Sequence, residues 1–423
     1  MKEDFLHYLW KYKKFGSSTL KTAEGESIII RSAGQTNHNA GPDFFNAQLQ
    51  IGEQLWIGNV EIHLKSSDWY FHSHEKDKSY DNVILHVVWE HDTDVFRSDN
   101  SVLPTIVLKD YIPKNILTNY EELYSKRNHW INCESNFSDI SDLLIDNWLE
   151  RLYLERLERK SEAIRFLLRD LKNDWEEVLF KMLTKNFGLN INGEAFLSMA
   201  NATPFSIVRK TQSNLQMLEA LFFGQSGLLE DTHENGYYKN LVLDYQFLKQ
   251  KFALDNINIM PVQFFRLRPI NFPTIRLSQL SSLYHKHQNL FSKIMDAQTL
   301  EAYYELFKVS TTSFWENHYT FFKESKASVK FVSKAFIHLL LINTILPLKF
   351  CYAKHKGEPV EHEVLYIISN IESETNGIVN AFNNLKPLSK SALHSQALIQ
   401  LKTEYCDKHK CLQCAIGSKL LCR

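Results

Sequence analysis

The sequence predicts an α+β fold in which a strand-rich N-terminal domain precedes a large all-α domain. Between about residues 25 and 110, apolar and polar side chains alternate with the period of two that is typical of half-buried strands. After Pro113 the apolar residues recur at a spacing near 3.6, which is typical of amphipathic helices. Four of the six cysteines lie between Cys406 and Cys422, and they predict a short metal-binding tail.

The N-terminal domain is expected over residues 1–115. A helix over residues 4–13 opens it, and several strands follow. The turn at residues 52–54 joins the second and third strands into a hairpin. The strands are expected over residues 27–31, 47–51, 56–64, 83–89 and 105–108.

The helical domain is expected over residues 116–403, and the cysteine tail over residues 404–423. Residues 139–142 can cap a long helix that runs past Ile164. The apolar stretch of residues 335–350 is shorter than a membrane span, and we expect a buried core helix that ends near Pro347. Further helices are expected over residues 174–187, 213–222, 239–252, 277–291, 299–306, 330–344 and 387–403.

Composition excludes several classes of protein. The chain has 423 residues, of which 44% are hydrophobic and 23% charged, as in soluble globular proteins and unlike disordered chains or coiled-coil rods. Its 48 basic and 49 acidic residues leave a formal charge of -1, so no global basic field indicates nucleic acid. The N-terminus lacks the apolar region of a secretory signal. We therefore expect a cytoplasmic protein with reduced cysteines and no membrane partner.

A candidate metal site lies at the hairpin of the N-terminal domain. Asp43 precedes one strand, and Glu61, His63 and Lys65 share one face of the next because alternate side chains of a strand point the same way. Carboxylate oxygens are the ligands that Mg²⁺ and Mn²⁺ prefer. We therefore expect a divalent ion on Asp43 and Glu61.

A second polar group follows in the sequence and is dense in histidine and aspartate. His72, His74 and His86 are candidate metal ligands within it, or they contact a phosphate. His86 interrupts an otherwise apolar strand, so a hydrogen-bonded core histidine is the alternative for that residue alone. Residues 37–39, which include His38, are expected on the same surface.

Pro42-Asp43, followed after seventeen residues by Glu61-Ile62-His63, resembles the Pro-Asp…Asp/Glu-x-Lys signature of the restriction-endonuclease-like nuclease superfamily. The resemblance implies a mixed β-sheet domain of that type, with Asp43 and Glu61 holding the metal on adjacent strands. His63 would replace the lysine as the base that positions water, and Lys65 would supply the positive charge. The implied chemistry is attack of a metal-activated water on a phosphodiester.

The tail has the pattern Cys406-x4-Cys411-x2-Cys414-x7-Cys422. Four thiolates can saturate a zinc ion or a [4Fe–4S] cluster, and both alternatives stay open beside coincidental free thiols. Zinc ribbons bring two Cys-x2-Cys pairs and this tail has one, which slightly favours iron–sulfur. The spacing is similar to the C-terminal iron–sulfur loop of endonuclease III and adenine glycosylases, which helps to place basic residues on DNA. That resemblance adds Lys408 and Lys410 as candidate DNA-binding residues, whereas Cys133 and Cys351 are expected to be core cysteines.

A basic, aromatic loop at residues 264–277 carries further candidates. Arg266, Arg268 and Arg276 would meet the phosphates of a nucleic acid, or they tie the loop to neighbouring helices. Both interpretations stay open at the level of sequence.

The patterns described above, taken along nearly the whole chain, identify it as a member of an uncharacterised bacterial family, domain-of-unknown-function family 2851. That membership implies no established activity. The residues favour a metal-dependent nuclease or nuclease-derived DNA-processing protein that hydrolyses phosphodiesters. The alternatives are a non-catalytic nucleic-acid-binding or scaffold protein with a structural metal cluster, and a metal-dependent hydrolase of another phosphoester.

Overall fold

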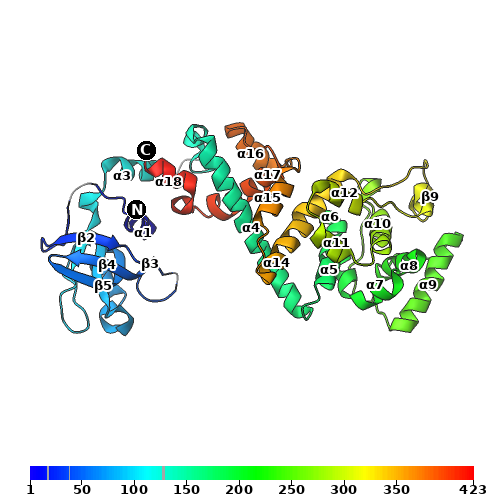
Figure 1. Ribbon diagram of the computed structural model, residues 1–423, viewed down its shortest axis with the longest axis horizontal. Coiled ribbons are helices and arrows are strands. Elements are labelled where there is room, and N and C mark those ends of the chain that lie inside the picture. Colours follow the sequence, from blue (N-terminus) through cyan, green and yellow to red (C-terminus); the bar gives the residue numbers. More distant parts are fainter. Residues whose placement is uncertain (17–18, 38, 126–128) are drawn as a thin grey trace. The chain divides into compact units, whose positions relative to one another are not determined.

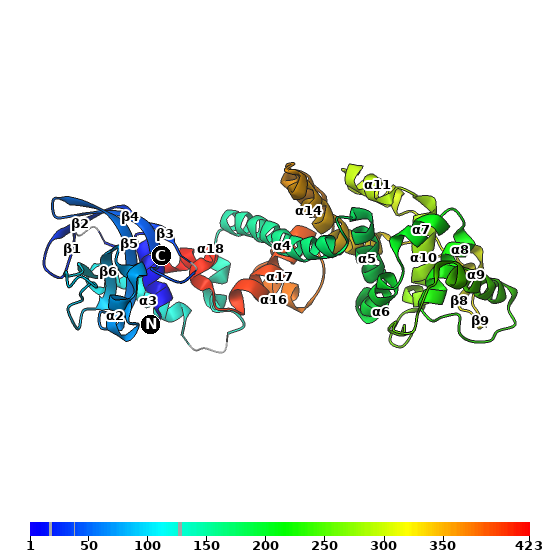
Figure 2. The same cartoon turned by 90° about the horizontal axis from the view of Figure 1, so that it is seen from below.

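Two compact units make up the computed structural model, which describes residues 1–16, 19–37, 39–125 and 129–423 (Figures 1 and 2). Unit 1 comprises Met1–Ile145 and Leu401–Arg423, and unit 2 comprises Asp146–Gln400. This grouping differs from the expected divisions at residues 115 and 403. The cysteine tail joins unit 1 because Asn115 and Asn119 donate hydrogen bonds to the carbonyls of Arg423 (2.7 Å) and Leu421 (3.3 Å).

Unit 1 is built on a mixed sheet, as the α+β prediction requires. β2 (Ser27–Ser32), β4 (Phe44–Ile51) and β5 (Gln54–Lys65) are antiparallel neighbours, and a two-residue turn joins β4 to β5. β6 (Val83–Glu90) and β7 (Thr105–Val107) continue the sheet parallel to β5. The short strands β1 (Leu20–Lys21) and β3 (Gln35–Thr36) pair with β2 and β4.

Two segments flank β5 and bring polar residues to it. Helix α1 (Glu3–Lys11) contacts β5 and buries Phe5, Leu6, Leu9 and Trp10. The crossover from β5 to β6 runs through α2 (Asp68–Phe71) and the short 3₁₀ turns η1 (His74–Lys76) and η2 (Lys78–Tyr80). A small core anchors this crossover and so fixes the residues between its members, and it consists of Trp69, Tyr80, Val83, Val95 and Leu103.

The rest of unit 1 combines residues from the two ends of the chain. Helix α3 (Lys114–Leu123) and the turn η4 (Glu134–Asp139) follow the sheet. The C-terminal segment contributes a π-helical turn η8 (Leu401–Cys406), a 3₁₀ turn η9 (Cys411–Gln413) and α18 (Ala415–Leu421). α18 packs on α3, so the two chain ends form one body.

Unit 2 is helical apart from a short hairpin, β8 (His318–Thr320) with β9 (Lys323–Glu324). The long helix α4 (Asp142–Asp170) begins at the predicted cap. The helix expected over residues 277–291 is two helices, because the chain leaves the helical conformation at His287. The helices of this unit after α4 are α5 (Trp175–Phe187), α6 (Leu189–Asn201), α7 (Phe205–Thr211), α8 (Leu215–Gln225), α9 (Gly236–Phe252), α10 (Pro273–Lys286), α11 (Leu290–Asp296), α12 (Leu300–Leu306), α13 (Lys334–Leu340), α14 (Leu346–Lys356), α15 (Glu361–Ser369), α16 (Gly377–Leu385) and α17 (Ala392–Gln400).

The most apolar helix does not end near Pro347, contrary to expectation. A π-helical turn, η7 (Leu341–Ile345), links α13 to α14, and Pro347 lies in the first turn of α14. The missing N–H of Pro347 is accommodated directly after the π-helical turn, where the hydrogen-bond pattern of the long helix changes. The combined helix Lys334–Lys356 is long and apolar enough to cross a membrane, but 72% of its apolar window is buried inside the protein. That burial fits the expected core helix of a soluble protein.

Candidate metal centre

Asp43 and Glu61 are held together across β4 and β5 by reciprocal hydrogen bonds. The Asp43 backbone N–H donates to Glu61 Oε2 (3.1 Å), and the Ile62 N–H donates to Asp43 Oδ2 (3.0 Å). The register that pairs Phe44 with Val60 brings the start of β4 opposite Glu61. The structure thus brings these two predicted residues together, with one oxygen of each carboxylate used in positioning.

Two histidines lie beside the other oxygen of Glu61, and a third adjoins them. His63 Nε2 lies 3.5 Å from Glu61 Oε1 and 3.2 Å from His72 Nδ1. His74 Nε2 lies 3.3 Å from the same Glu61 oxygen. One metal-binding atom from each of the three histidines lies within 4.8 Å of the other two. We call His63, His72, His74 and Glu61 the histidine–glutamate group.

The spacing of these atoms fits a tetrahedral ion. Nitrogen or oxygen ligands at ~2.0–2.1 Å from zinc lie about 3.3 Å from one another at the corners of a tetrahedron. Three separations in the group are of this size, namely 3.2 Å between His72 and His63, 3.5 Å between His63 and Glu61, and 3.3 Å between His74 and Glu61, and the three histidine nitrogens lie within 4.8 Å of one another. Imidazole suits zinc, iron and similar ions, whereas Mg²⁺ prefers oxygen. The donors therefore fit a zinc-like ion better than the Mg²⁺ expected from the two carboxylates.

His86 lies behind His63 and outside the histidine–glutamate group. Its Nε2 is 2.8 Å from His63 Nδ1, and the ring is completely buried on β6, opposite Glu61 in the parallel register. The expectation that His86 is itself a ligand is corrected on this geometry, because the His63 ring lies between it and the group. Burial and the neighbouring His63 and His74 lower the pKa of His86 well below 6.5.

His63 is also held as a neutral ring. Burial, with His74 and His72 nearby, lowers the pKa of His63 to about 4. A metal ligand must be a neutral imidazole, so the surroundings of His63 favour binding over carrying positive charge. Burial raises the pKa of Glu61, against the hydrogen bond from His74.

Two residues of α1 complete the site, and the sequence analysis missed both. His7 Nε2 lies 3.3 Å from Asp43 Oδ2. Burial raises the pKa of Glu3 to about 7, and the charges of Asp43 and Glu61 act in the same direction, opposed by His7. Glu3 and His7 are four positions apart on one helix, a spacing that places two polar side chains on the same face and was the available signal.

Aromatic rings fix His74 while His72 remains accessible. The ring of Tyr80 stacks on His74 with centroids 3.7 Å apart, and Trp69 meets the same ring edge-on at 5.4 Å. His72 is exposed and His74 half-buried, whereas His63 is buried. One side of the histidine–glutamate group therefore faces solvent, as a site that admits a substrate requires.

Lys65 is not brought into the group. It is exposed at the last position of β5, and its backbone N–H donates to Asp68 Oδ2 (3.0 Å). Within the described part of the chain its ammonium makes no ion pair with Asp43 or Glu61. His38 lies outside the described residues, and Asn37 braces the loop by donating to the carbonyl of Pro42 (3.0 Å).

Aspartates of the second polar group have local roles. Asp77 accepts from Ser79 and so caps η2. Asp92, in the loop after β6, accepts from the hydroxyls of Ser66 and Ser67 at 2.9 and 2.8 Å. These carboxylates shape the loops around the group, and of the predicted ligands in this stretch His72 and His74 enter it.

Arg276 is a core residue, so its assignment to nucleic-acid binding is corrected. Its guanidinium lies 3.6 Å from the centroid of the Phe336 ring. It donates to Gln279 Oε1 (2.8 Å) and to Asn271 Oδ1 (2.6 Å), and only 5% of the residue is exposed. Arg276 ties this loop to neighbouring side chains, which is the alternative to phosphate binding that the sequence left open.

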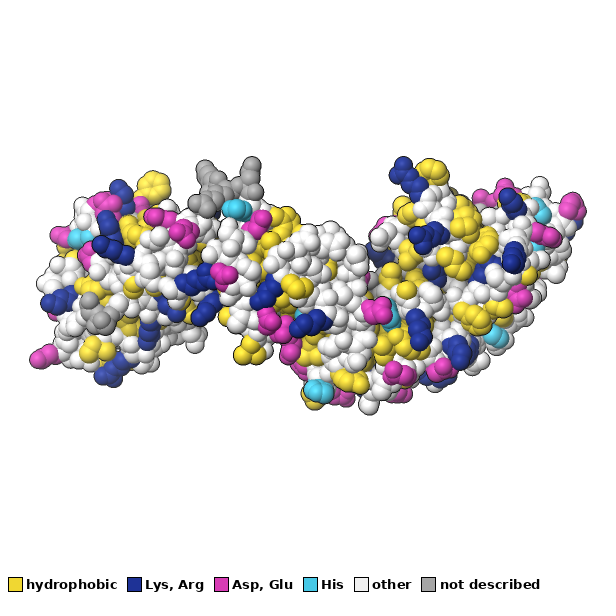
Figure 3. Space-filling view, turned by 90° about the horizontal axis from the view of Figure 1, so that it is seen from above, with side chains coloured by type: hydrophobic (Ala, Val, Ile, Leu, Met, Phe, Trp, Pro, Cys, Tyr) yellow, Lys and Arg dark blue, Asp and Glu magenta, His cyan; other side chains and the backbone are white. Residues whose placement is uncertain are grey.

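The other predicted basic residues are exposed. Arg266 and Arg268 lie in the irregular loop before η5 (Pro269–Asn271). Lys410 is exposed, and Lys408 forms an ion pair with Glu404 at 2.5 Å. On the face drawn in Figure 3, dark-blue basic and magenta acidic side chains are interspersed, in keeping with the net charge of -1.

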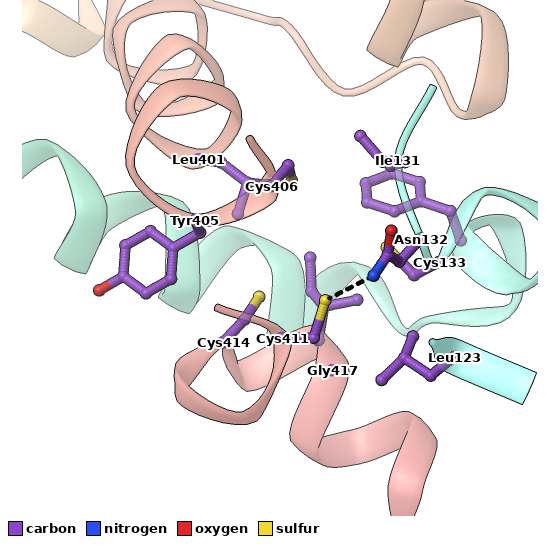
Figure 4. Close-up of a pocket in the computed structure, with 12 residues that line it drawn as sticks. Leu123, Ile131, Asn132, Cys133, Leu401, Tyr405, Cys406, Cys411, Cys414 and Gly417 are labelled. Atoms are coloured by element: carbon purple, nitrogen blue, oxygen red, sulfur yellow. Dashed lines mark hydrogen bonds between the residues drawn. The ribbon is translucent and has the colours of Figure 1, made fainter. Parts of the chain in front are cut away.

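Three of the four predicted cysteines gather, and the fourth does not. Cys406, Cys411 and Cys414 line one pocket together with Cys133 (Figure 4). Cys422 is exposed, with its Sγ 3.7 Å from the Tyr8 hydroxyl. The seven residues of α18 separate Cys422 from Cys414, and a helix of that length advances about 10 Å. Cys133, expected to be an ordinary core cysteine, stands where Cys422 was expected.

Comparison with known proteins identifies one family. The family model described as "Protein of unknown function (DUF2851)" matches residues 3–377. The matched range contains the histidine–glutamate group and Cys133, and it ends before the other three cysteines of the pocket. No curated protein and no solved structure matches the chain, so the resemblances to restriction-endonuclease-like and endonuclease III proteins gain no support there.

Proposed function

The chain belongs to this family of unknown function, and we propose that unit 1 is a metal-dependent hydrolase of phosphodiesters with nucleic acid as its substrate class. The observation that carries the proposal is the gathering of His63, His72 and His74, with one ring nitrogen of each within 4.8 Å of the other two, and with His63 and His74 also 3.5 and 3.3 Å from Glu61 Oε1. Such a cluster, buried at His63 and exposed at His72, is a candidate for an active site.

The three histidines are suited to hold the ion, and Glu61 to act beside it. A bound ion of the zinc type polarises a phosphoryl oxygen and lowers the pKa of water. Three protein ligands leave a fourth position open, which is the arrangement of catalytic sites. The three histidines would hold the ion, and Glu61 Oε1, 3.3 Å from His74 Nε2, would serve as the base that accepts a proton from a nearby water.

The α1 side of the site can supply a proton. Burial lowers the pKa of His7, but its close approach to Asp43 and the charges of Asp43 and Glu3 outweigh burial, so the net change is upward. A protonated His7 can give its proton to the leaving oxygen of a phosphodiester, while Asp43 orients the ring. Glu61 would then act as the base and His7 as the acid.

The choice of phosphodiesters rests on the resemblance to restriction-endonuclease-like nucleases. Asp43 stands at the start of β4 and Glu61 on β5, and these strands are adjacent, as that resemblance implies. His63 takes the place of the signature lysine, and the additional histidines make the donor set richer in nitrogen. Exposed Lys65 at the end of β5 can meet a phosphate outside the group.

A second candidate function follows from the same geometry. If Glu61 itself fills the fourth position, the site is closed, as structural zinc sites are. That arrangement favours a non-catalytic nucleic-acid-binding or scaffold protein. Hydrolysis of another phosphoester is the third possibility, and the choice of substrates in the assay separates it from nuclease activity.

The test combines cleavage with metal content. Labelled single- and double-stranded DNA and RNA, and a small phosphodiester, are incubated with the full chain and Zn²⁺, Mn²⁺ or Mg²⁺. Wild type should cleave nucleic acid, Glu61→Gln should keep its metal but lose cleavage, and His72→Ala should lose both. Asp43→Asn should slow cleavage with the metal retained, and His91→Ala, which changes a histidine paired with Asp94, is the matched control.

Two results would reject the catalytic proposal. One is the absence of cleavage by metal-loaded wild type on every substrate. The other is cleavage that survives both Glu61→Gln and His72→Ala. Metal bound without cleavage, and lost in His72→Ala, would favour the scaffold candidate.

A further inference from the structure

Four cysteines from two distant stretches of unit 1 surround one pocket (Figure 4). Cys133 precedes η4, Cys406 ends η8, Cys411 begins η9, and Cys414 precedes α18. Cys414 is buried and the other three are half-buried. The remaining lining is mainly apolar and includes Leu123, Ile131, Phe137, Leu401 and Ile416.

The sulfurs are spread more widely than a single zinc ion requires. Thiolates at ~2.3 Å from zinc lie about 3.8 Å apart at the corners of a tetrahedron. Among the described residues, three of these sulfurs do not form a group within 4.8 Å of one another, whereas His63, His72 and His74 do. A cubane cluster places its iron and sulfide core between the thiolates and so holds them further apart than one ion does.

Polar contacts in the pocket suit thiolate ligands. The Asn132 side-chain amide donates to Cys411 Sγ at 3.5 Å, the contact drawn in Figure 4. Hydrogen bonds to cluster sulfurs, with an apolar shell that excludes solvent, are the protein's means of stabilising an iron–sulfur site. The Lys402 ammonium, which pairs with Asp407, lies 5.2 Å from the centroid of the Trp130 ring, and its charge favours the thiolate form of Cys406.

The backbone of α18 at Gly417 packs directly against the backbone of η9 at Cys411. A Cβ added at Gly417 would lie 2.1 Å from the carbonyl oxygen of Cys411, a distance that real Cβ atoms do not reach. α18 therefore packs directly on η9 and fixes the position of both Cys411 and Cys414. The packing of the backbone therefore fixes where the sulfurs of Cys411 and Cys414 lie.

We propose that Cys133, Cys406, Cys411 and Cys414 hold a [4Fe–4S] cluster and that Cys422 stands outside it. The cluster fastens the C-terminal segment 401–423 to the turn around Cys133. Asn132 and Cys411, which bond across this junction, are 279 positions apart in the chain. Four thiolates saturate the four irons, so the site is closed and its role is to hold unit 1 together. The inference is independent of the proposed hydrolase activity.

The first test compares two cysteine variants of the full chain after anaerobic purification. Iron, acid-labile sulfide, zinc and the visible absorption spectrum are measured. Wild type and Cys422→Ser should contain about four iron and four sulfide per chain, and Cys133→Ser should lose most of both. Cys351→Ser, which changes a buried cysteine of unit 2, is the control for a general effect of cysteine replacement.

A second test needs no variant and therefore does not depend on folding of Cys133→Ser. Wild type is alkylated with iodoacetamide before and after the cluster is removed with acid and chelator. Cys422 should react at once, and the four pocket cysteines only after removal. Zinc in place of iron, protection of Cys422, early labelling of Cys133, or loss of iron in Cys422→Ser but not in Cys133→Ser would each overturn the proposal.

Discussion

His63 Nδ1 and His86 Nε2 lie 2.8 Å apart in the interior of unit 1. His63 Nε2 faces Glu61 and His72, so a metal bound there needs the lone pair of that nitrogen and leaves the proton on Nδ1. His63 must then donate to His86 Nε2, and His86 carries its own proton on Nδ1. The hydrogen bond between His63 and His86 fixes both the tautomer and the ring orientation of His63 as a metal ligand.

Replacing His86 with phenylalanine should weaken metal binding while the fold persists. Phenylalanine keeps an aromatic ring there, although a larger one, and removes the acceptor for His63 Nδ1–H, and loss of such a partner costs about 10- to 100-fold in metal affinity. A competition titration with a zinc chelator measures the change. His91→Ala should bind like wild type, since His91 pairs with Asp94 away from the group. Wild-type affinity in His86→Phe would contradict this positioning role.

Arg276→Ala should destabilise unit 2, whereas Arg268→Ala should not. Removal of Arg276 uncovers Phe336 and leaves the buried Gln279 and the half-buried Asn271 without their donor, at a cost of about 2–4 kcal/mol. Arg268 is exposed, and such a change is within about 0.5 kcal/mol. Thermal unfolding of the two proteins measures the difference, and equal melting temperatures would contradict the burial of Arg276.

Gly417→Ala should disrupt the cysteine pocket. The new Cβ would collide with the Cys411 carbonyl, and overpacking of this kind costs about 1–3 kcal/mol. Gly377→Ala is the matched control, because a Cβ there meets nothing within 4 Å. Iron content and melting temperature should both fall in Gly417→Ala and stay unchanged in Gly377→Ala. Full iron content in Gly417→Ala would mean that α18 does not pack on η9 as described.

Glu219 should make the stability of unit 2 depend on pH. Burial raises its pKa from 4.5 to about 7, against hydrogen bonds from Ser278 and Tyr237. Between pH 4.5 and about 7 the Glu219 carboxyl is protonated in the folded protein but ionised in the unfolded chain. The free energy of unfolding therefore falls as pH rises through this range, and it no longer changes with this group above about pH 7. The loss is on the order of 3 kcal/mol.

Glu219→Gln should remove that dependence. The variant should melt higher than wild type at pH 8 and close to it at pH 5, because the amide cannot ionise. Glu305→Gln, which changes an exposed carboxylate paired with Lys308, controls for the general loss of a charge. The same change in melting temperature at both pH values would show that Glu219 does not titrate in this range.

Patterns within short stretches of sequence were sufficient to predict the strands and helices that depend mainly on neighbouring residues. Alternation of apolar residues predicted β2, β4, β5 and β6, and the cap at residues 139–142 predicted the start of α4. Pairing of adjacent strands then placed Asp43 beside Glu61, since a hairpin fixes its own register.

The rest depended on contacts between residues that are distant in the sequence. His7 reaches Asp43 only because α1 packs on β5, and Cys133 joins the tail cysteines only because α18 packs on α3. The sequence of the basic, aromatic loop at residues 264–277 does not indicate that Arg276 is buried in the core. Spacing within one segment carries no information on which nitrogen of His63 faces His86.

Crystals of the protein soaked in zinc would test the central claim most directly through anomalous scattering at the zinc edge. The account predicts a peak bounded by the nitrogens of His63, His72 and His74, with Glu61 Oε1 at the fourth side, and its loss in crystals of His72→Ala. A map without density at the three histidines, or with the ion on Asp43 alone, would contradict a histidine-based metal centre and with it the proposed hydrolase.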